Sequence, residues 1–105
     1  MPKLEVGNFM APRKHGEPIV FEFVLPYDIA IMHASIHLTT VSATEARLRL
    51  TYLTGTDELC KYKLIAVRAG HEHADLRAEE FVTRATSFVS TSEVDGAYYL
   101  FALPA

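Results

Sequence analysis

Apolar and polar residues alternate with period two along several stretches of the chain. The clearest first example runs from Pro18 to Leu25. One set of alternate positions in it is wholly apolar: Ile19, Phe21, Phe23 and Leu25. Successive side chains of a strand point to opposite faces, so this stretch is expected to be a strand with one buried face.

A second clean alternation runs from Glu45 to Leu53. Its apolar positions are Ala46, Leu48, Leu50 and Tyr52, and its polar positions include Arg47, Arg49 and Thr51. The stretch from Leu59 to Arg68 is expected to pair with it as a hairpin. Between the two lies Thr54-Gly55-Thr56-Asp57, where glycine suits the positive φ of a tight turn.

The stretch from Ile29 to Val41 fits two interpretations. Ala30, Met32, Ala34, Ile36 and Leu38 occupy alternate positions, as in a strand, while Ile29, Met32 and Ile36 also lie near one helical stripe. We favour the strand, because the segment continues into Thr39, Thr40 and Val41 and no helix stop signal follows.

The C-terminal third is expected to contribute two more strands, Phe81 to Ser90 and Ala97 to Leu103. Asp95-Gly96, within the turn expected from Glu93 to Gly96, is a favourable hairpin dipeptide. The charged stretch from Ala69 to Glu80 is interpreted as a loop with one short helix beginning at Asp75.

These elements predict an all-β fold, an antiparallel β-sandwich of jelly-roll-like order with at most one or two short helices. Residues 1–17 contain two prolines and two glycines with little periodicity, and are interpreted as an extended N-terminal arm. Residues 18–105 are then a single β-sandwich domain.

The amino-acid composition limits the classes of partner that the chain is expected to bind. The net charge of −3 argues against a nucleic-acid-binding face, and no apolar run approaches the length of a membrane helix. No secretory signal is visible, so synthesis in the cytoplasm is expected. Cys60, the one cysteine, fits a reducing compartment or a small buried residue.

Metal binding has one local candidate. His71 and His73 would share a face of a strand, and Glu79 follows at a distance that loosely resembles the cupin pattern. The second cupin motif is absent, so a solvated loop without metal is the favoured interpretation. His33 and His37 would share zinc only on a helix, because four residues of strand separate them by roughly 13 Å.

Other signatures of catalysis are missing. No nucleophile elbow and no glycine-rich phosphate loop occurs in the chain, so neither catalytic residues nor a cofactor are predicted. Arg13, Lys14 and His15 form a small basic cluster, interpreted as a solvated charge run, with a phosphate or an acidic partner as the alternative.

The last strand suggests self-association. Tyr98, Leu100 and Ala102 lie on one face of it and Tyr99, Phe101 and Leu103 on the other, so both faces are apolar. A two-layer domain covers only one of them. We therefore expect a homo-oligomer, with Tyr98, Leu100 and Ala102 at the interface.

The whole pattern resembles small β-sandwich structural proteins of tailed bacteriophages. It includes Leu25-Pro26-Tyr27-Asp28 after the first strand, Leu48-Arg49-Leu50-Thr51-Tyr52 in the middle and Asp95-Gly96-Ala97-Tyr98-Tyr99-Leu100 near the end. The resemblance implies a non-enzymatic virion component of tail, baseplate, neck or capsid decoration, with itself and other assembly proteins as partners. The alternative is a module that binds a small ligand or carbohydrate, with Tyr27, Tyr52 or Tyr62 as stacking platforms.

Overall fold

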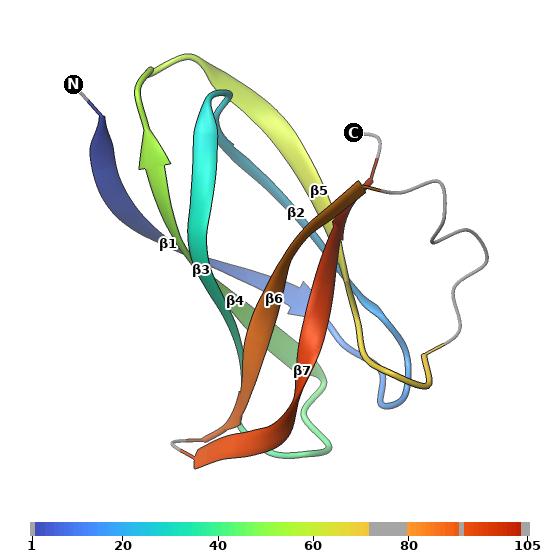
Figure 1. Ribbon diagram of the computed structural model, residues 1–105. Coiled ribbons are helices and arrows are strands. Elements are labelled where there is room, and N and C mark those ends of the chain that lie inside the picture. The colour runs from blue at the N-terminus through green and yellow to red at the C-terminus, as the bar shows by residue number, and fades with distance from the viewer. Residues whose placement is uncertain (1, 72–79, 91, 104–105) are drawn as a thin grey trace.

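The computed structural model describes residues 2–71, 80–90 and 92–103, with the backbone alone for residues 92–96. Seven strands occur in this part of the chain, and no helix (Figure 1). They are β1 (Lys3–Pro12), β2 (Ile19–Pro26), β3 (Ile29–Leu38), β4 (Glu45–Thr54), β5 (Leu59–Val67), β6 (Glu80–Val89) and β7 (Ser92–Ala102). The predicted all-β fold is confirmed. Within the described ranges, no helix could serve as a membrane span.

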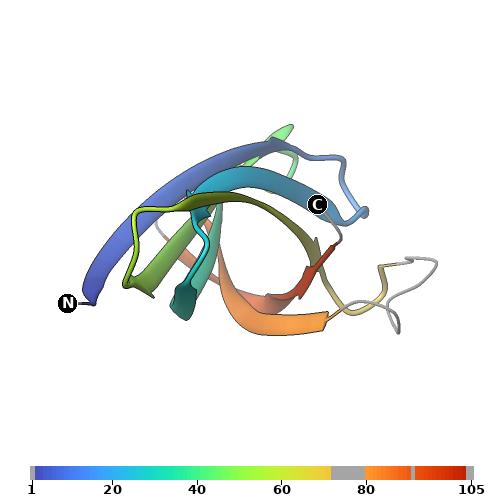
Figure 2. The same cartoon turned by 90° about the horizontal axis from the view of Figure 1, so that it is seen from above.

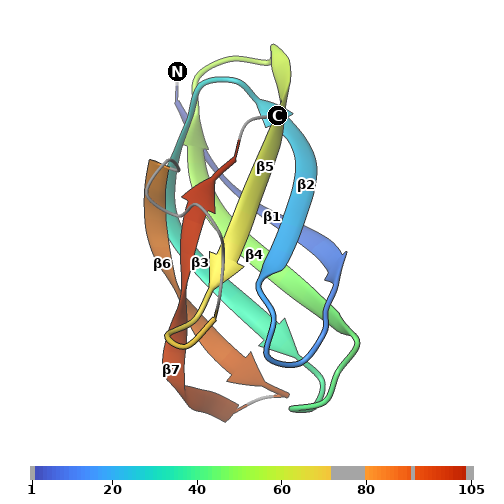
Figure 3. The same cartoon turned by 90° about the vertical axis from the view of Figure 1, so that its right-hand side faces the viewer.

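The seven strands form one sheet in the order β1-β4-β3-β6-β7-β5-β2. The sheet curls until its two edge strands, β1 and β2, approach each other, so the molecule is a nearly closed barrel (Figure 2). Seen from the side, β7, β5 and β2 make one wall and β1, β4 and β3 the other, and β6 joins the two walls between β3 and β7 (Figure 3). The prediction of wholly antiparallel pairing is wrong at one place, because β3 and β6 are parallel.

The core lies between the two walls and is built from the inward face of each strand. In β2 the four alternate apolar residues are buried, as the sequence predicts. In β4 the same is true of Ala46, Leu48, Leu50 and Tyr52. Each large apolar side chain buried in this way contributes roughly 1.5–3 kcal/mol, so these two strands carry much of the stability.

Strand β3 confirms the strand interpretation but not one continuous alternation. Its pairing with β4 shifts between Ile31 and His33, so Met32 lies in a bulge and is exposed. A bulge reverses which side chains point inward. Ile31 is partly buried before it, whereas Ala34 and Ile36 are buried after it.

The predicted N-terminal arm is wrong for most of its length. Lys3–Pro12 is strand β1, paired with β4 from Lys3 opposite Thr54 to Pro12 opposite Glu45. Phe9 packs onto the core, where its ring stacks on Phe23 of β2 at 4.3 Å between centroids. The period-two signal is weak here because β1 is an edge strand and most of its side chains are exposed.

The predicted hairpin between the two middle strands is also wrong. Strand β4 pairs with β1 and β3, whereas β5 pairs with β2 and β7. The intervening residues 55–58 cross from one wall to the other, and Gly55 does not have a positive φ. Alternation identifies a strand but does not identify its neighbour, and a chain can change wall at any loop.

The last turn lies earlier than the sequence predicts. Strands β6 and β7 form an antiparallel hairpin in which Val89 is opposite Ser92. Ser90 has φ 56°, the left-handed conformation that tight hairpin turns need. Asp95 and Gly96 therefore lie inside β7. The short helix expected from Asp75 falls outside the described residues.

Candidate functional site

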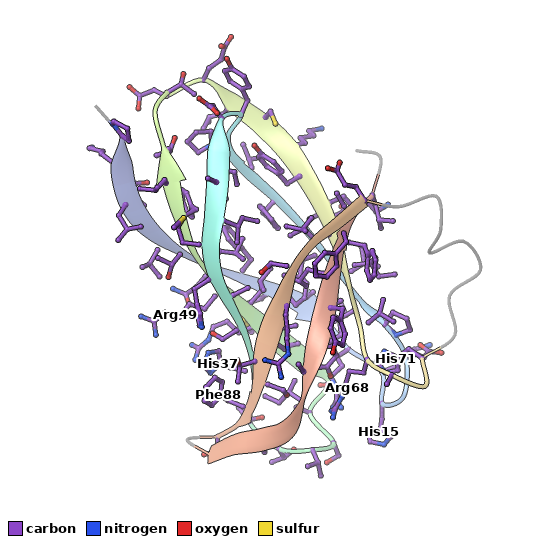
Figure 4. The ribbon with its side chains drawn as sticks, viewed as in Figure 1. His15, His37, Arg49, Arg68, His71 and Phe88 are labelled. Atoms are coloured by element: carbon purple, nitrogen blue, oxygen red, sulfur yellow. The ribbon has the colours of Figure 1, made fainter. Side chains whose placement is uncertain are left out.

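Two segments that are far apart in the sequence meet at one end of the barrel (Figure 4). Residues 13–17 follow β1, and residues 68–71 follow β5. Tyr98 of β7 lies with them. Together they line a cavity of about 330 Å³, whose lining residues are Arg13, His15, Gly16, Glu17, Arg68, Ala69, Gly70, His71 and Tyr98. We refer to it as the end cavity.

Arg13 is an anchored residue of the end cavity. Its side chain is buried, and its Nη1 donates hydrogen bonds of 2.9 Å to the carbonyl oxygens of Val41 and Ala43. Its main-chain N–H donates to the carbonyl oxygen of Thr44 at 2.8 Å. The interpretation of the basic cluster as a solvated charge run is therefore wrong for Arg13. Lys14 and His15 are exposed as expected.

Arg68 and His71 pack around the ring of Tyr98. The guanidinium carbon of Arg68 lies 5.3 Å from the ring centroid, within the range of a cation–π interaction. The His71 ring is tilted against the same tyrosine at 6.2 Å. The main-chain N–H of Arg68 donates to Nδ1 of His71 at 2.9 Å, so the neutral imidazole carries its hydrogen on Nε2.

The electrostatic setting of His71 is positive. Burial lowers its pKa from the usual value, and the nearby positive charges of Arg68 and Arg13 lower it further. Gly70, with φ +93°, makes the turn that returns the imidazole to Arg68. The neutral ring is thus favoured, and its N–H group at Nε2 donates to no described group.

The metal hypothesis is only partly within the described residues. His71 is described, and its Nδ1 is occupied by the hydrogen bond from Arg68. His73 and Glu79 lie outside the described residues. No group of three or more potential metal ligands occurs among the residues that the structure describes.

A second polar cluster lies on the outer face of β3 and β4, together with Phe88 of β6 (Figure 4). His37 is opposite Arg47 on one side and Phe88 on the other. Its ring stacks on Phe88 with 4.9 Å between centroids, and its Nε2 lies 2.8 Å from Oγ of Ser35. Burial, followed by the charges of Arg47 and Arg49, lowers the pKa of His37.

This cluster borders a shallow cavity of about 440 Å³ lined by Met10, His37, Leu38, Thr39, Ala43, Thr44, Glu45, Arg47 and Ser90. Because β3 is a strand, the helical geometry in which His33 and His37 would share zinc does not occur. His33 lies opposite Thr51, beyond the bulge, and is exposed.

The three tyrosines considered as stacking platforms have different roles. Tyr52 is buried, and its hydroxyl donates to Oε2 of Glu5 at 3.3 Å. The hydroxyl of Tyr62 lies within 2.9 Å of the carbonyl oxygens of Pro26 and Tyr27, and burial, then Cys60 and Asp28, raise its pKa to about 12. Of the three, Tyr27 alone presents an exposed ring.

The predicted interface residues on the last strand lie largely inside the protomer. Tyr98 is 1% exposed and Leu100 0%, so both belong to the core and neither can contact another chain as predicted; Ala102 is partly buried. The opposite face of β7 is the exposed one. On that face the ring of Tyr99 lies beside the ring of Phe81 of β6, with 6.5 Å between the ring centroids.

Among the described side chains, the largest apolar exposure along one strand is on β1, the segment that the sequence predicts to be an arm. Leu4, Val6 and Met10 are 64%, 49% and 58% exposed. They occupy alternate positions and so share the outer face of the sheet. Their spacing was the available signal, but Pro2, Gly7 and Pro12 obscured it.

No protein-family model, no curated protein and no solved structure matches this chain.

Proposed function

We propose that the protein is a non-enzymatic structural module that self-associates through strand β1. One observation carries the proposal: β1 is a ten-residue edge strand with an exposed apolar row on its outer face. No described strand pairs with the side of β1 that faces away from β4. An edge strand of this kind presents unpaired N–H and C=O groups to which another strand can add.

Where the edge strands β1 and β2 approach each other, the geometry favours the first half of β1 as the contact with a second copy. Its second half lies against β2 through the stacked rings of Phe9 and Phe23. Its first half diverges from β2 (Figure 1). A second copy that pairs with residues 3–7 would extend the sheet and place its own side chains beside Leu4 and Val6, which are otherwise in solvent.

The other edge strand is a poorer candidate. Strand β2 has eight residues against ten in β1, and both strands have a proline directly before them and at their end. Its exposed face carries Glu22, which pairs with Lys63 of β5 at 3.6 Å. A charged side chain in the middle of an edge strand is a usual protection against pairing.

Sedimentation velocity tests the proposal. We expect the wild-type protein to form an oligomer at high micromolar concentration, and Val6→Lys to sediment as a monomer, because the lysine places a charge in the contact. Met32→Lys is the matched control, since Met32 is 59% exposed but lies in the β3 bulge away from the edge. A monomeric wild-type protein would contradict the proposal.

The nature of the assembly is a further proposal. We propose that this assembly is part of a phage virion and includes other assembly proteins. The sequence resemblance supports this proposal. Synthesis in the cytoplasm likewise stays a prediction.

A further inference from the structure

We propose that the end cavity binds a small oxyanion of the phosphate class. This inference goes beyond self-association and does not depend on it, because the end cavity and the first half of β1 share no residues. The lining of the end cavity is positively charged, and it presents hydrogen-bond donors that are held in place.

The described lining of the end cavity is more positive than the chain as a whole. It contains the guanidinium groups of Arg13 and Arg68, two imidazoles and one carboxylate, that of Glu17. The whole chain has a net charge of −3. Within the described ranges, the one ion pair joins Lys63 and Glu22, so neither arginine is paired with a described carboxylate. Such a cavity attracts an anion.

The donors come from two sides of the cavity. The guanidinium of Arg68 makes no hydrogen bond to any described group. His71 contributes its Nε2–H, because its Nδ1 already accepts a hydrogen bond. His15, an exposed residue, lies on the other side with its Nδ1 3.5 Å from Nη2 of Arg13.

These donors are held in place before any ligand arrives. Arg68 rests on the ring of Tyr98, which is buried, and His71 is hydrogen-bonded to the main chain of Arg68. Arg13 is fixed by two carbonyl oxygens, so its charge stays at the cavity wall. Donors that are already ordered lose little conformational entropy when they bind.

The arrangement suits phosphate better than a carboxylate. Arg68, His71 and His15 offer donors from separate directions, and a tetrahedral anion with several oxygens can accept from all of them. A carboxylate has two oxygens in one plane. The volume of about 330 Å³ also leaves room beside a phosphate group for a small substituent.

NMR titration of the full chain with inorganic phosphate, at constant ionic strength, tests the inference. We expect saturable shifts of the Arg68 and His71 signals. Arg68→Gln should weaken the affinity for phosphate about tenfold, which corresponds to ~1.4 kcal/mol. Arg49→Gln is the matched control, because Arg49 is an exposed arginine on the outer face of β4, away from the cavity (Figure 4).

Two further measurements distinguish phosphate binding in the end cavity from misfolding and from unspecific anion binding. His15→Gln changes an exposed residue and should weaken phosphate binding severalfold in a folded protein, as judged by its amide spectrum. Acetate at the same ionic strength should shift these signals far less than phosphate. The inference is overturned if phosphate causes no saturable shift, if acetate binds equally well, or if Arg49→Gln weakens binding as much as Arg68→Gln.

Discussion

At the scale of single residues, Arg13 links parts of the chain that are distant in sequence. Its side chain joins the end of β1 to the loop between β3 and β4 through Val41 and Ala43. Hydrogen bonds from a charged donor contribute about 1.5–3 kcal/mol each, and a buried carbonyl that loses its donor is costly. Arg13 thus closes one end of the β1-β4-β3 wall.

Replacing Arg13 by methionine should therefore destabilise the fold. We expect Arg13→Met to lower the free energy of unfolding by about 2–4 kcal/mol in urea denaturation, because two carbonyl groups lose their partner. Lys14→Met, one residue further and exposed, is the control and should change it by less than about 0.5 kcal/mol. Equal losses from the two substitutions would show that the Arg13 hydrogen bonds contribute little.

His37 should make stability depend on pH. Its pKa in the folded protein lies below 6.5, because of burial and then of Arg47 and Arg49. The unfolded chain takes up this proton more readily, so the contribution of His37 is present above about pH 6.5 and is lost as the pH falls through the lowered pKa.

Urea unfolding across this pH range tests the effect of His37. Compared with wild type, His37→Gln should lose less stability between about pH 7 and pH 5. Arg47→Gln should give an intermediate loss, because one of the charges that lower the His37 pKa is gone. Ser35 and Phe88 contact the ring and Glu45 lines the same cavity, and all three stay in both variants. Identical pH profiles for wild type and His37→Gln would contradict the account.

At the scale of elements, β1 is the strand that decides how the sheet ends. Gly7 lies in its middle and leaves room for the ring of Phe9, since a Cβ at this position would lie 2.7 Å from Cζ of Phe9. That ring stacks on Phe23 of β2. A side chain at residue 7 would therefore disturb the contact that brings the two edges of the sheet together.

Gly7→Ala should weaken this contact. We expect a loss of about 1–3 kcal/mol in the free energy of unfolding, from displacement of the Phe9 ring. Gly55→Ala is the matched control, because the nearest atom to its added Cβ is 3.9 Å away and its φ is not positive. If Gly7→Ala is as stable as Gly55→Ala, the ring of Phe9 can move at no cost.

The elements also show which part of the fold could be predicted from the sequence. The strands β2 and β4 could be predicted from alternation alone, because each has one buried face and one face that is largely exposed to solvent. The β3 bulge at Met32 and the turn at Ser90 do not, since neither has a glycine or another strong local signal. The pairing partner of a strand depends on whether the loop before or after it crosses from one wall to the other. The alternation of apolar and polar residues carries no information about such crossings.

At the scale of the whole molecule, curling of the sheet explains the outcome for the candidate sites. It brings Arg13 and His15 next to Arg68 and His71, although about 55 positions separate the pairs. The sequence singled out Arg13, His15 and His71 individually, but neither Arg68 nor the proximity of these groups could be predicted from it. Curling also places Tyr98 and Leu100 inside the barrel, because β7 has β5 and β6 as neighbours and faces the opposite wall. The exposed apolar row lies on β1 instead.

The self-association of β1 is the central claim, and amide hydrogen exchange at two protein concentrations tests it most directly. Amides that become hydrogen-bonded in an added strand exchange more slowly. We predict that outward-facing amides within residues 3–7 become protected when the wild-type protein is concentrated, while those of the β2 edge do not. Unchanged exchange over residues 3–7 in a protein that is oligomeric at the higher concentration would contradict the claim.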